Sequence, residues 1–201
     1  MKTSIESIFP TDIYLFNDVL EPEYVDSMKE DIINSSKQKE RKNWQSDSYI
    51  HYLPKYKALS EMIMKGAKYV FEDKKYDYDT FEITNMWSNI LKSGENHRPH
   101  THSNNILSGV YYVESDETAN INFYDPRPSA GVLVPKISKF DKTNSGLWQF
   151  KSTTNSMIMF PSWLQHFVPV NTSNKIRISI AFNVMLKGIV GDPKELQSAE
   201  F

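Results

Sequence analysis

The sequence predicts a mostly β fold with N-terminal helices: a double-stranded β-helix of the jelly-roll, cupin-like type. Two observations support this fold class. Residues 1–79 contain two segments with the apolar spacing of amphipathic helices. Residues 80–186 consist of short runs rich in Ile, Val, Phe, Tyr and Trp, which Gly, Pro, Asn, Asp and Ser separate. Strands that follow two helices in this way are typical of a jelly roll whose helices pack against one sheet.

The length of 201 residues is that of a single domain. We expect residues 1–79 to be its mainly helical N-terminal part and residues 80–186 its β core. Residues 187–201 are expected to form a loosely ordered C-terminal tail.

Two helices are expected after a short extended segment at residues 8–16. The stretch EPEYVDSMKEDIINSS, residues 21–36, has a proline near its start and acidic residues in its first turn, which favour a helix. Residues 55–71 place apolar side chains close to the helical period. A polar link rich in Lys and Ser separates the two.

Eight strands are expected in the β core. They are the runs FEITNMWSNIL, ILSGVYYV, ANINFYD, GVLV, GLWQF, SMIMF, HFVPV and KIRISIAFNVM. The last run alternates most clearly, because its aliphatic residues occupy one face and Arg177, Ser179, Ala181 and Asn183 occupy the other. If the second face lines a pocket, Arg177 there indicates an anionic ligand. The alternative is a half-exposed strand with Arg177 in water.

Charge and composition exclude several function classes. The formal net charge is −2 and the isoelectric point about 6.2, so no general basic field attracts nucleic acid or an anionic membrane. We expect neither as a partner. The chain has no cysteine, so nitrogen and oxygen atoms must hold any metal ion. Because the N-terminus lacks a signal peptide's apolar core, a cytoplasmic location is expected.

Three histidines have the spacing of a metal site. His100 and His102 flank Thr101, so on an extended strand their side chains point to the same face. His166 follows a strand and a turn in FPSWLQHFVPV. Two ligands from one strand end and a third from a distant strand are typical of mononuclear sites on β barrels. The alternative is two surface histidines and one hydrogen-bonded core histidine.

These motifs resemble the superfamily of oxygenases that depend on Fe(II) and 2-oxoglutarate. In that superfamily a His-x-Asp/Glu pair, a distal His and then an Arg or Lys occur in this order. The segments WSNILKSGENHRPHTHSNNILSGVYYV, INFYDPRP and MIMFPSWLQHFVPVNTSNKIRISIAFNV are similar to a family of oxygenases known from bacteria and phages, distantly related to prolyl hydroxylases. The resemblance covers residues 81–185. It implies a bacterial or phage-encoded dioxygenase that hydroxylates its substrate while 2-oxoglutarate is decarboxylated to succinate.

The resemblance also implies the cofactors and the site residues. Fe(II), 2-oxoglutarate and O2 are the expected cofactors, with His100 and His166 as metal ligands. Arg177 matches the basic residue that pairs with the distal carboxylate of 2-oxoglutarate. The other residues expected at the co-substrate are Ser179, Tyr112, Asn89 and Trp87.

His102 departs from the superfamily pattern because it stands where a carboxylate is usual. Three neutral histidines leave Fe(II) with less charge compensation than two histidines and a carboxylate. We favour His100, His102 and His166 as the ligands. Two alternatives are open: water or Asn104 takes the third position, or His102 and Asn104 form a shifted pair.

His97 and His51 are expected to be solvated or substrate-facing, and Asp125 and Arg127 to be turn residues. Two other functions compete: a three-histidine dioxygenase that uses no 2-oxoglutarate, and a non-catalytic metal- or ligand-binding module. The substrate is expected to be a protein side chain or a small metabolite. A homodimer is expected from superfamily habit alone.

Overall fold

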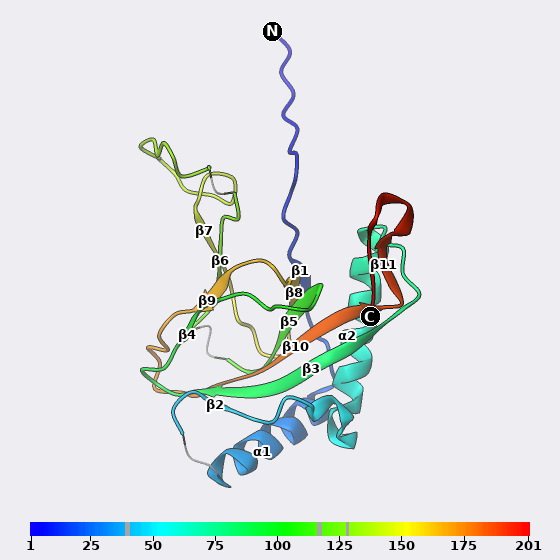
Figure 1. Ribbon diagram of the computed structural model, residues 1–201. Helices are drawn as coiled ribbons and strands as arrows, with labels where there is room; N and C mark the ends of the chain where they lie inside the picture. The colour runs from blue at the N-terminus through cyan, green and yellow to red at the C-terminus, as the bar shows by residue number, and fades with distance from the viewer. Residues whose placement is uncertain (39–40, 116–117, 128) are drawn as a thin grey trace.

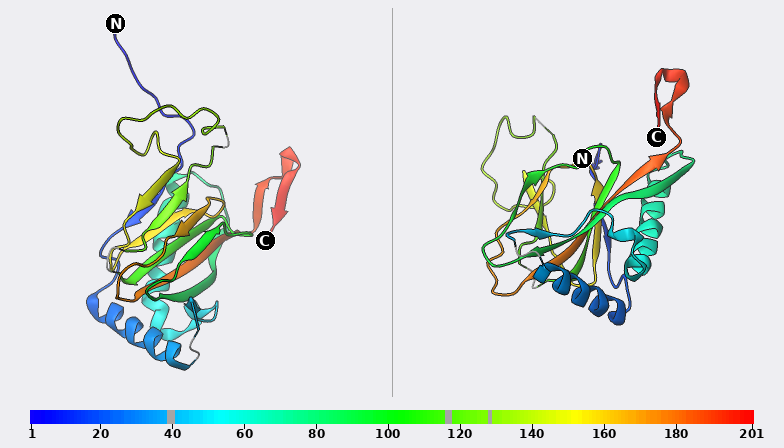
Figure 2. Two further views of the ribbon diagram at one scale, coloured as in Figure 1. Left: turned by 90° about the vertical axis from the view of Figure 1, so that its left-hand side faces the viewer. Right: turned by 60° about the horizontal axis from the view of Figure 1, so that its bottom comes forward.

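The computed structural model describes residues 1–38, 41–115, 118–127 and 129–201. Two antiparallel sheets face each other, and helices cover the outer face of the larger one (Figures 1 and 2). The helices are α1 (Pro22–Gln38), α2 (Lys57–Asp73) and, between them, the short 3-10 helices η1 (Ile50–Tyr52) and η2 (Pro54–Tyr56). The expected double-stranded β-helix with N-terminal helices is therefore confirmed.

Strands distant in sequence are neighbours in both sheets. Within the described residues, the larger sheet has the order β1 (Tyr14–Phe16), β8 (Met157–Pro161), β5 (Leu107–Glu114), β10 (Arg177–Lys187), β3 (Thr80–Leu91), β2 (Trp44–Gln45). The smaller sheet has the order β4 (His97–His100), β9 (His166–Val168), β6 (Ile121–Tyr124), β7 (Leu147–Phe150). β10 is central because it pairs with β5 along one edge and with β3 along the other, and both of its faces are buried.

The main core lies between the larger sheet and the helices. The apolar face of β10, which includes Ile180 and Phe182, packs in one cluster with Ile63 and Phe71 of α2. Strand β5 passes close to this core at Gly109, where an added Cβ would lie 2.3 Å from the ring of Phe182. The opposite face of β10 is thereby directed toward the smaller sheet, as the alternation predicts.

The N-terminal part contributes more than helices. β1 forms one edge of the larger sheet by pairing with β8, in agreement with the extended segment expected there. β2 forms the other edge, where Trp44 pairs with Ile90 and Gln45 with Asn89. The polar link in which β2 lies carries no strand pattern, because two residues are too few to show an alternation.

One expected strand is wrong. Residues 131–134, GVLV, lie in the loop between β6 and β7, and Val132, Leu133 and Val134 are each more than three-quarters exposed. No strand of the described residues pairs with this run, and Pro135 follows it immediately. The short polar run HRPH forms β4 instead, because its neighbour β9 supplies hydrogen-bonding partners.

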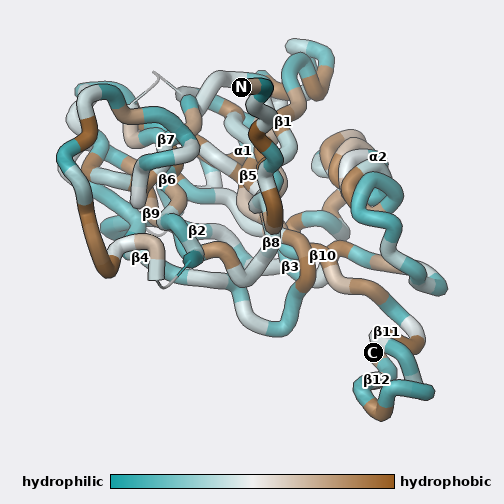
Figure 3. Tube along the Cα trace, turned by 90° about the horizontal axis from the view of Figure 1, so that it is seen from above, coloured by the Kyte–Doolittle hydropathy of each residue, from teal (hydrophilic) through white to brown (hydrophobic). Residues whose placement is uncertain are grey.

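The C-terminal tail is also more ordered than expected. β10 continues to Lys187, and the chain then folds into a hairpin of β11 (Ile189–Asp192) and β12 (Gln197–Glu200), with η3 (Pro193–Glu195) between them. The hairpin protrudes from the body (Figure 3). Gly188 and Gly191 have φ angles of 93° and 90°, which other residues rarely adopt, and so permit the tight change of direction. In the described parts of the chain no helix has the length and apolar character of a membrane span.

Candidate metal centre

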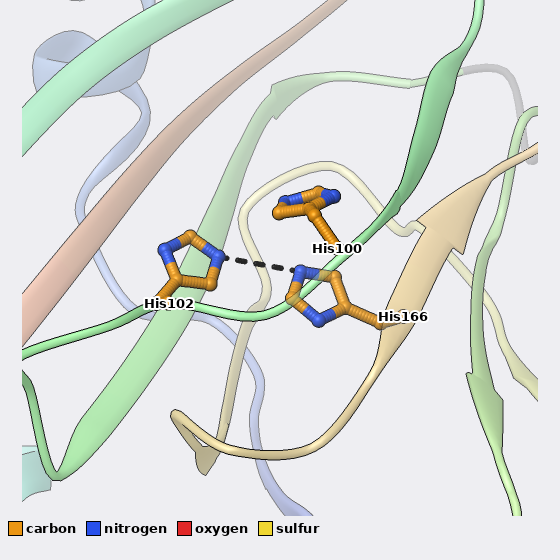
Figure 4. A group of neighbouring side chains, drawn as sticks. All are labelled: His100, His102 and His166. Carbon is orange, nitrogen blue, oxygen red and sulfur yellow. Dashed lines mark hydrogen bonds between the residues drawn. The ribbon is translucent and has the colours of Figure 1, made fainter.

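The smaller sheet brings the three histidines together. His100 ends β4 and pairs in register with His166, the first residue of β9. His102 lies just beyond the strand, where its backbone N–H donates to the carbonyl of Ser162 over 2.9 Å. The three rings surround a common point (Figure 4). The expected grouping is therefore present, although His102 reaches it from a loop and not from a continuous strand.

The spacing of the rings suits one metal ion. The Nε2 atoms of His102 and His166 are 3.4 Å apart. One ring nitrogen from each of the three histidines lies within 4.8 Å of the others. Metal–nitrogen bonds of about 2.1 Å at right angles place neighbouring ligand atoms about 3 Å apart. A small inward movement of the side chains would therefore complete a mononuclear site.

Backbone carbonyls set the tautomers of two rings. Nδ1 of His100 donates to the carbonyl of Arg98 over 2.7 Å, and Nδ1 of His166 donates to that of Leu164 over 2.9 Å. Each bond places the proton on Nδ1 and leaves the Nε2 lone pair free. Orienting bonds of this kind are typical of metal-ligating histidines.

Burial also favours the ligating form of the rings. It lowers the pKa of His166 to about 3 and that of His102 to about 4, and the neighbouring His100 contributes to both shifts. Both imidazoles are therefore neutral at pH 7, as metal binding requires. The donor set fits a divalent transition ion with open positions.

Other polar residues do not join this group. Asn104 is exposed, has a left-handed φ of 62° and does not line the cavity, so neither alternative that used it is supported. His51 packs on Tyr52 in η1 with ring centroids 4.1 Å apart. Arg127 donates from Nε and Nη2 to the Asp125 carboxylate over 2.9 and 2.7 Å, in agreement with a local role in the loop after β6.

A cavity of about 630 Å³ between the sheets contains the histidine cluster. Its residues from the larger sheet include Trp87 and Asn89 of β3 and Arg177 and Ser179 of β10. Four residues that the sequence analysis predicts at the co-substrate thus line the same cavity as the histidines. Tyr112 lies immediately behind Arg177. Its ring centroid is 5.0 Å from Cζ of Arg177.

Arg177 is a buried cation without a counter-ion among the described residues. Arg177 is only 3% exposed, and no carboxylate in the described residues pairs with it. Nη1 donates to Oγ of Ser179 over 3.1 Å, whereas Nε has no hydrogen-bond partner. Burial lowers the pKa of Arg177, because the buried charge is poorly solvated. An uncompensated buried charge is costly, so this end of the cavity fits an anionic ligand.

Comparison with known proteins agrees with this geometry. Residues 85–183, which include the histidine cluster and Arg177, match the model of a family described as "Putative 2OG-Fe(II) oxygenase". The chain belongs to the 2-oxoglutarate/Fe(II) oxygenases. No curated protein sequence matches this oxygenase.

Solved structures share the fold of this oxygenase at low sequence identity. The alpha-ketoglutarate-dependent epimerase SnoN from nogalamycin biosynthesis is 11% identical, with a TM-score of 0.66 over 89% of this chain and 77% of SnoN. A Pseudomonas putida prolyl-4-hydroxylase is 10% identical, with a TM-score of 0.62 over 89% of each chain. HygX from Streptomyces hygroscopicus, solved with nickel and 2-oxoglutarate, is 9% identical, with a TM-score of 0.65 over 88% of this chain and 83% of HygX.

Several residues that line the oxygenase cavity could not be predicted from the sequence. Lys42, Asn43 and Gln45 line it from the segment around β2, and Nε2 of Gln45 donates to Oδ1 of Asn89 over 2.9 Å. The register of β2 on β3 brings them there, and that register is not visible in a local pattern. His97 also lines the cavity, and its Nε2 is buried. Of the two expectations for this ring, the solvated one is wrong, and the one that faces the substrate space agrees with the structure.

Proposed function

We propose that this oxygenase is a hydroxylase whose substrate enters the same cavity that holds Fe(II) and 2-oxoglutarate. The observation that carries the proposal is the unpaired Arg177 guanidinium in one cavity with three histidines. A metal-binding cluster alone fits many functions. A buried cation in the same space selects a co-substrate that carries its own negative charge.

Each residue has a task that its position supports. His100, His102 and His166 hold the metal ion, and Arg177 and Ser179 hold the distal carboxylate of 2-oxoglutarate at the other end of the cavity. Bound Fe(II) supplies O2 activation coupled to oxidative decarboxylation of 2-oxoglutarate. The apolar residues Val110, Ile121, Phe160 and Val168 line the cavity and help to exclude water.

The two competing functions lack such support. A three-histidine dioxygenase without 2-oxoglutarate has no use for a buried arginine that lacks a counter-ion. A non-catalytic binding module would tolerate one, but it does not account for membership of an oxygenase family. We therefore propose the 2-oxoglutarate-dependent reaction in preference to both.

The cavity lining favours a polar substrate with negative charge. Lys42 and Arg98 are exposed residues at its mouth, and the lining within the described residues includes no Asp or Glu. A small metabolite with a carboxylate or phosphate, or a protein side chain beside acidic residues, fits this charge. We do not propose a nucleic acid, because the formal net charge is −2 and Tyr112 and Phe160 near the site are fully buried and unable to stack on bases. We propose a cytoplasmic location, where Fe(II) and 2-oxoglutarate are both available.

The test is anaerobic reconstitution with Fe(II) followed by titration with 2-oxoglutarate. We expect the weak visible band of an Fe(II)–2-oxoacid chelate at about 500 nm. Arg177→Ala should weaken 2-oxoglutarate binding about tenfold or more, and His166→Ala should abolish the band. Asn104→Ala is the matched control and should behave as wild type. Bound iron without any band at saturating 2-oxoglutarate would refute the proposal.

A further inference from the structure

His97 is the fourth histidine of the cavity and is not placed with the metal ligands. It begins β4, three residues before His100, and pairs in register with Val168 of β9. Its ring lines the cavity, and its Nε2 is buried without a hydrogen-bond partner. A buried polar atom of this kind is uncommon in a folded protein unless a ligand or water completes it.

The fold directs His97 toward the Arg177 end of the cavity. Arg177 pairs in register with Leu91 in the larger sheet, and His97 pairs with Val168 in the smaller sheet. Leu91 and Val168 pack together in one small core cluster. The two sheets therefore hold His97 and Arg177 at the same level, on opposite sides of the space that both line.

Three of the buried unpartnered polar atoms at or beside the cavity can donate, namely Nε of Arg177, the hydroxyl of Tyr112 and Nε2 of His97, whereas Oδ1 of Asn43 is an acceptor. Burial lowers the pKa of His97 to about 4, and the Arg177 charge adds to the shift, so the ring is neutral at pH 7 and can carry one N–H. A carboxylate can accept hydrogen bonds from all three donors, because its two oxygens offer about four lone-pair positions.

We propose that His97 is a positioning residue for 2-oxoglutarate, with Nε2–H donating to the distal carboxylate opposite Arg177. The inference rests on the proposed function, because it assigns a further contact to the same co-substrate. Donors from both sheets then bind the carboxylate. The cavity would therefore bind a 2-oxo dicarboxylate more tightly than a 2-oxo acid that ends in a methyl group. The discrimination comes from donors that would be left buried and unpaired beside that methyl group.

The experiment compares two probes on the anaerobic Fe(II) protein through the chelate band. 2-Oxoglutarate carries the distal carboxylate, and 2-oxopentanoate has the same chain length without it. His97→Phe should weaken 2-oxoglutarate binding about tenfold and leave 2-oxopentanoate binding within about twofold, since a hydrogen bond to a charged group is lost only with the first probe. His97→Gln, which retains an N–H donor, should recover part of the affinity.

A matched control is available in the same chain. His51 is a half-buried histidine outside the cavity whose two ring nitrogens also lack partners. His51→Phe should leave both affinities unchanged. Fe(II) affinity and thermal unfolding of each variant show whether it is folded and metal-loaded.

The outcomes separate this inference from the proposed function. Equal 2-oxoglutarate affinity in wild type and His97→Phe would overturn the role of His97, as would an equal loss for both probes. A wild-type protein that binds Fe(II) but neither probe would instead refute the proposed function. If His97→Phe does not fold, His97→Gln carries the test through the ratio of the two affinities.

Discussion

Replacing Arg177 with methionine should stabilise the ligand-free protein while it weakens co-substrate binding. Methionine keeps a long apolar side chain of similar reach but removes the charge. In the ligand-free protein the guanidinium is buried, has one hydrogen bond to Ser179 and lies over the ring of Tyr112. No carboxylate of the described residues compensates it. The site therefore carries an electrostatic cost that only a ligand removes.

The magnitude follows from opposing contributions. Replacing buried ionic groups by apolar side chains of similar volume is neutral or stabilising by about 1–4 kcal/mol. The lost contact with the Tyr112 ring offsets about 0.5–2 kcal/mol of this. A net gain of about 1–2 kcal/mol corresponds to a rise in Tm of about 2–8 °C for a domain of this size.

Co-substrate should stabilise wild type more than the Arg177→Met protein. At a concentration of one hundred times its Kd, 2-oxoglutarate stabilises wild type by about 2.7 kcal/mol. A tenfold weaker variant gains only about 1.4 kcal/mol at the same concentration. The unfolding curves of the two proteins should therefore lie closer together, or change order, when 2-oxoglutarate is added.

The assay is anaerobic thermal unfolding of the Fe(II) protein with and without 2-oxoglutarate. Arg127→Met is the matched control, because Arg127 is an exposed arginine paired with Asp125 outside the cavity. Its loss should change the unfolding free energy by less than about 1 kcal/mol and leave the 2-oxoglutarate effect intact. A ligand-free Arg177→Met protein that is less stable than wild type, with an undiminished 2-oxoglutarate effect, would refute this reasoning.

Three further predictions follow from the structure. His102→Asp restores the carboxylate that is usual in this superfamily and should tighten Fe(II) binding about tenfold through added charge compensation; competition with a chelator measures this, and weaker binding would contradict it. Gly109→Ala should cost about 1–3 kcal/mol of unfolding free energy because the new Cβ would meet Phe182, and denaturant unfolding with no loss would show that β5 can move away. Ending the chain at Lys187 should lower the unfolding free energy by no more than about 1 kcal/mol, since most of the removed hairpin is exposed, and a larger loss would mean that the hairpin supports the core.

Several features of the fold follow from local sequence patterns. The alternation in β10 predicts both its buried aliphatic face and the opposite face that carries Arg177 and Ser179. This works because the side-chain period of a strand is set by backbone geometry and not by neighbours. The helical period of α2 follows for the same reason. The order of the three histidines in the sequence likewise indicates a metal site before any contact is known.

Features that depend on pairing between distant segments required the tertiary structure. GVLV has the composition of a strand but no partner, whereas HRPH has little strand character and pairs with β9. Asn43 and Gln45 reach the cavity only through the register of β2. A two-residue strand has no period, and a strand exists only where another supplies its hydrogen bonds.

The sequence by itself determined which side chains were available for chemistry and on which face of each strand they lie. Only the tertiary structure decided that Arg177 has no counter-ion in the part of the chain that the structure describes, that His102 joins the histidine cluster from beyond a strand end, and that His97 faces the cavity. These are properties of burial and of distances between the two sheets. They arise because loop closure and sheet packing bring together residues whose separation along the chain carries no local signal.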